Sequence, residues 1–371
     1  MNDDFNQNTN LNTTTYKPVF LNMGLGEDAK EIQRLMNDKN VTVYNNIYPQ
    51  VAELIKTQNP GNRFSPAEME QKVAELLKEK AAGTYGTWVY YPWSNRLVHI
   101  LDEEDFITVR TNRNLYKITP EESALLRTKK IAIIGLSVGQ TIAQTIATER
   151  ICGELRLADF DTLELGNLNR LNAGVQDLGL HKVVIAARKI AEIDPYIKVQ
   201  CWPEGINVNN IDEFLTGGEK VDVLVEECDS FDIKVISRIK AKQYGIAVVM
   251  DTNDIGMLDV ERYDIENNRA IFHGKIPELE TMPVFELAVL LKNLSFEEKV
   301  GYLAKIIGFE NTSDEMKFSL SQLGKTITGW PQLASAVTLG AAVATDTCRR
   351  ILLGKFLNSG RFFVRLDKLV Q

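Results

Sequence analysis

The sequence predicts an α/β fold: an open, mostly parallel sheet with helices on both faces, preceded by a mixed α+β extension. From Lys129 to Asp251, short β-branched apolar runs alternate with amphipathic stretches. Buried parallel strands have this near-continuous apolar character, and the stretches between them are typical of crossover helices. A glycine-containing turn follows the first run, KIAII. The composition, with 44% apolar and 25% charged residues over 371, is that of a globular protein and excludes collagen-like or wholly disordered chains.

The first part of the chain predicts a tail over residues 1–25 and an α+β extension over 26–109. We expect helices at 27–38 and 65–82, the second starting in a capping box of Ser65 and Glu68 and stopped by Gly83. A strand is expected at 41–47. The aromatic stretch YGTWVYYPWSNRLVHIL predicts a strand pair that packs on a core or an interface. Aromatic residues can also stack on nucleic-acid bases, but only Arg96 supplies positive charge here.

The second part, residues 110–371, carries the main sheet. Strands are predicted for KIAII, LRLAD, IKVQCW, VDVLVE and IAVVMD. The helices between them are expected at 140–150, 181–193, near 209–215 and at 231–244. Residues 255–330 form an insert with hairpins expected within 257–273 and helices at 296–307 and 313–324. The small-residue stretch 333–347 predicts a buried helix, because it is too short to span a membrane and contains Asp346.

The turn after the first strand reads Gly135-Leu-Ser137-Val-Gly139-Gln140. A dinucleotide fingerprint is G-x-G-x-x-G, and here only the first glycine is in place. The backbone can still turn at Gly135 and offer amides at a helix N-terminus to a phosphate, although an ordinary turn fits equally well. Asp159 ends the second strand, where an acid can accept ribose hydroxyls or form a turn.

The stretch that follows is more specific: Asp159-Phe-Asp161-Thr-Leu-Glu-Leu-Gly-Asn167-Leu-Asn-Arg170. It resembles the D-x-D-x-[VL]-E-x-x-N-L-x-R signature of the ThiF/MoeB and ubiquitin-activating-enzyme family, whose adenylation domain is Rossmann-like. The resemblance continues at Gly179-Leu-His-Lys182 and at Cys228-Asp229-Ser230, and it covers about residues 110–366.

The resemblance implies ATP-dependent adenylation of a carboxylate, usually the C-terminus of a small ubiquitin-like or sulfur-carrier-type protein, with release of pyrophosphate. In this sequence it implies a ribose ligand at Asp159, triphosphate ligands at Asn167, Arg170 and Lys182, and a Mg²⁺ ligand at Asp229. These residue types suit the chemistry, because an anionic carboxylate approaches an anionic phosphate and the charge must be offset. Within the turn, Gly135, Ser137 and Gly139 are the residues expected to contact phosphate. Asp161 is a second acid of the site or a cap for the turn, and Asp229 can also cap helix 231–244.

Arg113 is a further candidate catalytic residue. Arg110-Thr-Asn-Arg113-Asn occupies the position of an R-Y-x-R-Q motif in the family. In the MoeB branch the second arginine enters the ATP site of the partner subunit. The resemblance therefore implies a homodimer with Arg113 as a finger supplied in trans; an ordinary surface arginine is the alternative.

The four cysteines form no C-x-x-C pair and lie in apolar patterns, so we expect core thiols, no structural zinc and no covalent thioester on this chain. The net charge of −8 argues against a nucleic-acid groove. No basic start with an apolar core marks a secretory signal, so a cytoplasmic protein is expected. Competing functions are a nucleotide- or protein-binding module without chemistry, an NAD-dependent oxidoreductase on the same topology, and activation of a non-protein carboxylate or an RNA carbonyl.

Overall fold

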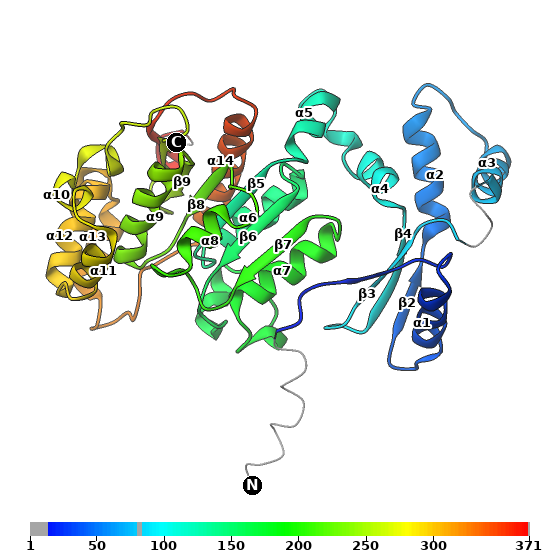
Figure 1. Cartoon of the computed structure of the whole chain (residues 1–371), viewed down its shortest axis with the longest axis horizontal. Helices are drawn as coiled ribbons and strands as arrows, with labels where there is room; N and C mark the ends of the chain where they lie inside the picture. Colours follow the sequence, from blue (N-terminus) through cyan, green and yellow to red (C-terminus); the bar gives the residue numbers. More distant parts are fainter. Residues whose placement is uncertain (1–13, 80–83, 370–371) are drawn as a thin grey trace, which may run out of the picture. The chain divides into compact units, whose positions relative to one another are not determined.

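The computed structural model describes residues 14–79 and 84–369, which fall into two compact units (Figure 1). Unit 1 holds the described residues up to Pro120 together with Asp194–Tyr196. Unit 2 holds Glu121–Ile193 and the described residues from Ile197 onward. The domain boundaries suggested at residues 25 and 109 stay predictions. Residues 1–13 of the expected tail and the helix stop expected at Gly83 lie outside the described residues.

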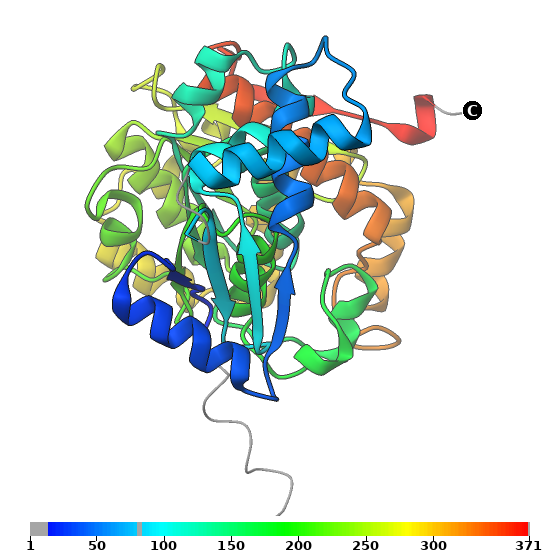
Figure 2. The same cartoon turned by 90° about the vertical axis from the view of Figure 1, so that its right-hand side faces the viewer.

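Unit 1 is built on a four-stranded sheet in the order β1-β3-β4-β2, which Figure 2 shows face-on. Its strands are β1 (Val19–Leu21), β2 (Thr42–Asn45), β3 (Thr87–Tyr91) and β4 (Arg96–Ile100). β3 and β4 form an antiparallel pair, β1 adds antiparallel to β3, and β2 runs parallel to β4. The strands expected at 41–47 and in the aromatic stretch are confirmed. β1 lies within the stretch that the sequence suggested as a tail.

The helices of unit 1 are α1 (Gly26–Asn37), α2 (Ile47–Gln58), α3 (Pro66–Glu79) and α4 (Glu103–Arg110). α3 starts in the predicted capping box: the Ser65 amide donates to Glu68 Oε2 at 2.8 Å, and Ser65 Oγ accepts from the Glu68 amide at 3.3 Å. α2 was not predicted; Pro49 lies in its first turn, where an amide has no partner within the helix. Trp88 and Tyr91 are buried, as expected for core residues of the strand pair.

Unit 2 is built on a seven-stranded sheet in the order β11-β10-β9-β8-β5-β6-β7. β5 to β9 run parallel to one another, β10 is antiparallel to β9, and β11 is antiparallel to β10. This is the predicted doubly wound, Rossmann-like sheet. The strands are β5 (Lys130–Ile134), β6 (Glu154–Ala158), β7 (Lys198–Trp202), β8 (Val223–Glu226), β9 (Ala247–Asp251), β10 (Met257–Arg262) and β11 (Gly360–Phe363).

Helices pack against both faces of this sheet (Figure 1). One face carries α6 (Gly139–Glu149), α7 (Lys182–Ile193) and the long α14 (Ala334–Leu352). The other carries α8 (Ile211–Thr216) and α9 (Phe231–Tyr244). The remaining helices are α5 (Pro120–Leu126), at the boundary of the units, and α10 (Pro277–Glu280), α11 (Val284–Lys292), α12 (Phe296–Ile307), α13 (Asp314–Gln322) and α15 (Leu366–Leu369).

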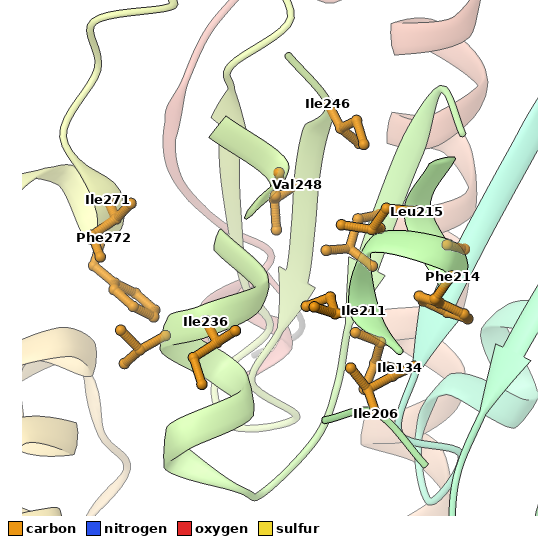
Figure 3. Packing of buried hydrophobic residues seen from close by; sticks show 14 of the residues in the cluster. Ile134, Ile206, Ile211, Phe214, Leu215, Ile236, Ile246, Val248, Ile271 and Phe272 are labelled. Atoms are coloured by element: carbon orange, nitrogen blue, oxygen red, sulfur yellow. The ribbon is translucent and has the colours of Figure 1, made fainter. Parts of the chain in front are cut away.

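The core between the sheet and α8 and α9 is apolar (Figure 3). Ile134 and Val248 from the strands meet Phe214 of α8 and Ile236 of α9, and all four are almost fully buried. At the edge of this core Arg238 is fully buried and bonds both Glu226 and Glu261, with its guanidinium 4.1 Å from the ring centroid of Phe272. This buried ionic network fixes α9 against the end of β8.

One predicted element of the insert is wrong. The hairpins expected within residues 257–273 do not form, because β10 pairs with β9 before it and with β11 about a hundred residues later, and Ile271–Gly274 is a 3₁₀ helix. The helices expected at 296–307 and 313–324 are confirmed as α12 and α13. Within the described ranges, no helix has both the length and the apolar character that a bilayer crossing requires.

Candidate functional site

The strand order of unit 2 contains a topological switch point beside β5. From β5 the chain builds β6 and β7 on one side of the sheet, and then β8 and β9 on the other. In open α/β sheets, ligands bind at such a point, beyond the carboxyl ends of the strands. A pocket of about 80 Å³ lies there, and its lining includes the predicted site residues Gly135, Ser137, Asp159, Asp161 and Asp229.

The turn after β5 requires glycine at its first position. Gly135 has φ +86°, and a Cβ on it would lie 2.6 Å from the backbone of Glu227 in the loop after β8. At Gly139, the first residue of α6, a Cβ would lie 2.7 Å from Ile133 Cγ2. The two glycines let the turn pack against both β5 and the β8 loop, so the departure from G-x-G-x-x-G still leaves a tight turn at a helix N-terminus.

Asp159 fastens this turn to the end of β6. Its Oδ2 accepts from the Leu136 amide at 2.6 Å, and its Oδ1 accepts from the Asp161 amide at 2.8 Å. Burial raises the pKa of Asp159, and the bond from Leu136 and the charge of Lys182 oppose that shift. The turn-forming role that the sequence left open is therefore observed, and the ribose contact stays a prediction.

Lys182 brings the two halves of the predicted phosphate site together. Its Nζ lies 2.8 Å from Asp161 Oδ2 and 3.1 Å from Ser137 Oγ, and the residue is 5% exposed. Lys182 begins α7, and its amide donates to the Asp161 carbonyl at 3.0 Å. A buried ammonium thus faces the turn after β5.

The loop between Leu163 and Leu180 keeps Lys182 next to Asp161 and Ser137. It is closed at its base by the Leu163 amide, which donates to the Leu180 carbonyl at 2.8 Å. Leu163 and Leu171 pack on Ile185 of α7 inside the loop. Leu171 is a core residue here. Gln140, which replaces the third glycine, is buried, and its Nε2 donates to the Asn172 carbonyl at 3.3 Å.

Arg170 lies at the end of the 3₁₀ helix Leu165–Asn169 and is half-buried. Its Nη1 donates to Asn169 Oδ1 at 2.9 Å, whereas its buried Nε has no hydrogen-bond partner among the described residues. Burial lowers the pKa of Arg170, and the charge of Asp229 opposes that shift. Asn167 uses its Oδ1 to accept from the Glu164 amide at 3.0 Å. An unsatisfied donor near the switch point suits an anionic ligand.

Asp229 is exposed, in the loop between β8 and α9. The alternative role of Asp229 as helix cap is wrong, because Ser230 is the N-cap residue of α9. Across the described ranges, no three His, Cys, Asp or Glu side chains are grouped to hold a metal ion. Arg113 is exposed in the 3₁₀ helix Asn112–Asn114 of unit 1, whereas all the other predicted site residues belong to unit 2.

A second pocket of unit 2, of about 260 Å³, adjoins the first and shares Glu227, Cys228 and Asp229 with it. No pattern in the sequence predicted this pocket. Its further lining comes from the end of β9, from α12 and α13, and from residues 330–332 before α14. The insert over 255–330 therefore covers the carboxyl ends of β8 and β9.

Two buried carboxyl groups, Glu227 and Asp251, line this larger pocket. Glu227 Oε1 accepts from the Asp251 amide at 2.8 Å. Burial and the charge of Asp251 raise the pKa of Glu227 well above its ordinary value, and burial raises the pKa of Asp251 to about 7. The sequence contains one indication of these two residues: each is an acid at the carboxyl end of a buried apolar run that predicts a strand.

These shifts predict how stability depends on pH. Because both pKa values are raised on folding, the folded protein holds more protons than the unfolded chain between about pH 4 and 7. The free energy of unfolding should therefore fall as pH rises through that window. Asp251→Asn should reduce this fall between pH 5 and 8 by roughly 1 to 3 kcal/mol, measured by denaturant unfolding. An equal fall in both proteins would contradict the shifted pKa of Asp251.

Cys228 lines both pockets, and its surroundings disfavour the thiolate form. Its Sγ lies 3.1 Å from Glu226 Oε1, and burial raises the pKa of the thiol well above its ordinary value. Burial also raises the pKa of Cys348 to about 12. Nucleophilic cysteines require the thiolate, which both environments disfavour.

One family model and several known proteins match parts of this chain. Residues 109–252 match the model of the ThiF family. The uncharacterized protein MT1398 of Mycobacterium tuberculosis (strain CDC 1551 / Oshkosh) is 41% identical over 341 residues, which are 92% of this chain and 44% of that protein. Ubiquitin-like modifier-activating enzyme 5 of Drosophila willistoni is 29% identical over 130 residues, 33% of this chain and 32% of that protein. The chain thus spans less than half the length of these relatives.

Among solved structures, the crystal structure of PaaA resembles this chain with a TM-score of 0.51. The sequences are 19% identical, and the match covers 81% of this chain and 89% of PaaA. At this identity the likeness concerns the fold alone.

Proposed function

We propose that unit 2 binds ATP at the switch point and transfers its AMP moiety to a carboxylate, because residues 109–252 match the model of the ThiF family. The two cations near the turn after β5 carry the proposal. Lys182 faces Ser137 in the glycine-containing turn, and Arg170, which senses the charge of Asp229, has an Nε without a hydrogen-bond partner among the described residues. A nicotinamide dinucleotide site needs no such set of cations beside a carboxylate.

In the proposed step an oxygen of the acceptor carboxylate attacks the α-phosphorus of ATP. A new oxygen–phosphorus bond forms, and the bond from the α-phosphorus to the bridging oxygen of the β-phosphate breaks. Pyrophosphate leaves with that electron pair, and the product is an acyl adenylate. No proton transfer is needed. Lys182 and Arg170 offset the negative charge of the two anions as they approach each other and stabilise the charge of the transition state.

The residues present fit a magnesium ion. Asp229 offers an exposed carboxylate at the rim of the pocket, and Mg²⁺ in phosphate sites is held by one or two carboxylates together with phosphate oxygens and water. When bound, the ion supplies positive charge to the phosphates. The role assigned to Asp229 is to orient that ion, and Asp159 and Asn167 stay the candidates for ribose and phosphate contacts.

The family resemblance favours the C-terminus of a small ubiquitin-like or sulfur-carrier-type protein as acceptor, and a homodimer in which Arg113 serves the partner's site. The exposure of Arg113 suits that role. The surroundings of Cys228 and Cys348 support adenylation without a thioester on this chain.

The proposal predicts that Asp229→Asn removes the effect of magnesium on ATP binding. Titration calorimetry of the wild-type chain should show ATP binding at least tenfold tighter with Mg²⁺ than with EDTA, and the variant should show equal affinities. Asp232→Asn, three residues along in α9, is the control and should keep the magnesium effect. A magnesium effect of unchanged size in Asp229→Asn would rule out Asp229 as a ligand of the ion.

A further inference from the structure

The larger pocket of unit 2 has two chemically different parts. Its outer wall is aliphatic and comes from α12 and α13, including Leu303, Ile307, Met316 and Leu320. The part that adjoins the nucleotide pocket is polar and carries Glu227, which lines both pockets, and Asp251 lines the larger pocket next to Glu227. Its volume of about 260 Å³ is close to the lower end for small-molecule sites.

The polar part offers acceptors. Glu227 and Asp251 contribute carboxyl oxygens, and Asn253 contributes an Oδ1 that is buried without a hydrogen-bond partner among the described residues. Asn253 is held in the left-handed region at φ +53°. An unsatisfied buried acceptor costs free energy unless a ligand supplies the donor. This acceptor therefore suits a ligand that supplies a hydrogen-bond donor.

The cation of this pocket is already neutralised. Lys234 lines it, but its Nζ lies 2.9 Å from both oxygens of Glu226. A ligand carboxylate is therefore disfavoured inside the pocket and favoured toward Arg170 and Lys182 at the nucleotide site. The electrostatics and the aliphatic wall together orient a ligand. Its carboxylate lies toward the phosphates, its hydrogen-bond donor lies beside Glu227 and Asp251, and its apolar chain lies toward α12.

We propose that the acceptor is a free apolar α-amino acid, with its ammonium group bound by Glu227, Asp251 and Asn253 and its side chain in the aliphatic part of the larger pocket. This inference rests on the proposed adenylation and names its substrate class. A protein C-terminus is the competing acceptor. It differs from a free amino acid at the α-nitrogen, which belongs to an amide in a protein and to an ammonium group in the free amino acid.

Titration calorimetry of the full chain tests the proposal with four probes: L-leucine, 4-methylpentanoate, N-acetyl-L-leucine and glycine. Each is titrated with and without Mg²⁺ and α,β-methylene-ATP. L-leucine should bind at least tenfold more tightly than the other three, which lack the ammonium group or the apolar chain. Glu227→Gln should weaken L-leucine at least tenfold and leave 4-methylpentanoate unchanged.

A second variant tests the aliphatic part. Ala304→Trp places a large side chain at a pocket-lining, exposed position of α12 and should abolish L-leucine binding while the ATP analogue still binds. Val289→Trp, on the exposed face of α11 and outside the pocket lining, is the matched control and should bind both.

The outcomes separate the two proposals. N-acetyl-L-leucine binding as tightly as L-leucine, or L-leucine binding that Ala304→Trp leaves intact, overturns the amino-acid site while the adenylation proposal stands. No binding of L-leucine under either condition also overturns it. Failure of the ATP analogue to bind counts against the adenylation proposal. In that case, binding of L-leucine without the analogue still tests the amino-acid site in the larger pocket.

Discussion

Lys182→Met should lower the rate of ATP-dependent adenylate formation at least 100-fold, an order-of-magnitude expectation for losing a cation that stabilises transferring phosphate. Lys182 is 5% exposed and contacts both Ser137 and Asp161, so it contributes a fixed positive charge next to the turn after β5. Methionine keeps most of the buried aliphatic stem. The partner carboxylate of Asp161 is half exposed, so the stability should change by less than about 1 kcal/mol.

The measurement is ATP–pyrophosphate exchange with saturating acceptor, with unfolding by denaturant recorded in parallel. Lys189→Met is the control, because it removes the same charge from the same helix about two turns further along. That variant should retain wild-type exchange. Similar losses in both variants would indicate a general effect on α7 and contradict a specific role for the Lys182 ammonium group.

Gly135→Ala should destabilise unit 2 by roughly 2 to 4 kcal/mol, because alanine is strained at a left-handed φ and its Cβ would meet backbone. Gly135 has φ +86°, and the added atom would lie 2.6 Å from the carbonyl of Glu227. The loop after β8 has to move to accept it. Since that loop carries Asp229, the affinity for Mg²⁺·ATP should fall as well.

Gly166→Ala is the matched control for this change. A Cβ at Gly166 meets no atom within 4 Å, and its φ is not in the left-handed region. We expect its free energy of unfolding to stay within about 0.5 kcal/mol of wild type. If Gly135→Ala were equally neutral in urea unfolding, the tight packing of the turn against the β8 loop would be refuted.

The alternation of buried runs and amphipathic stretches was enough to predict the parallel part of the sheet, because strands covered by helices on both faces carry a strong local signal. The partners of β10 were not predictable in this way. Its pairing with β11 joins residues about a hundred positions apart, and no local pattern encodes such a contact. α2 was missed because Pro49 obscures a helix whose first turn tolerates it.

The site was predictable where a motif fixes several residues in order. The order of Asp159, Asp161 and Lys182 indicated one site, and the structure places Asp161 and Lys182 2.8 Å apart. The larger pocket was not predictable, because Glu227 and Asp251 meet only when β8 and β9 are neighbours. The aliphatic wall depends on how α12 and α13 lie over these strands, which amphipathic patterns do not specify.

The central claim, that the switch point of unit 2 is an ATP site, is tested most directly by thermal unfolding of the wild-type chain with ATP, AMP or NAD, each with and without Mg²⁺. A ligand at about 100 times its dissociation constant stabilises the protein that binds it by about 2.7 kcal/mol. We predict that ATP with Mg²⁺ gives the largest rise in melting temperature and that NAD gives none. Stabilisation by NAD in place of ATP, or by none of the three nucleotides, would contradict the claim.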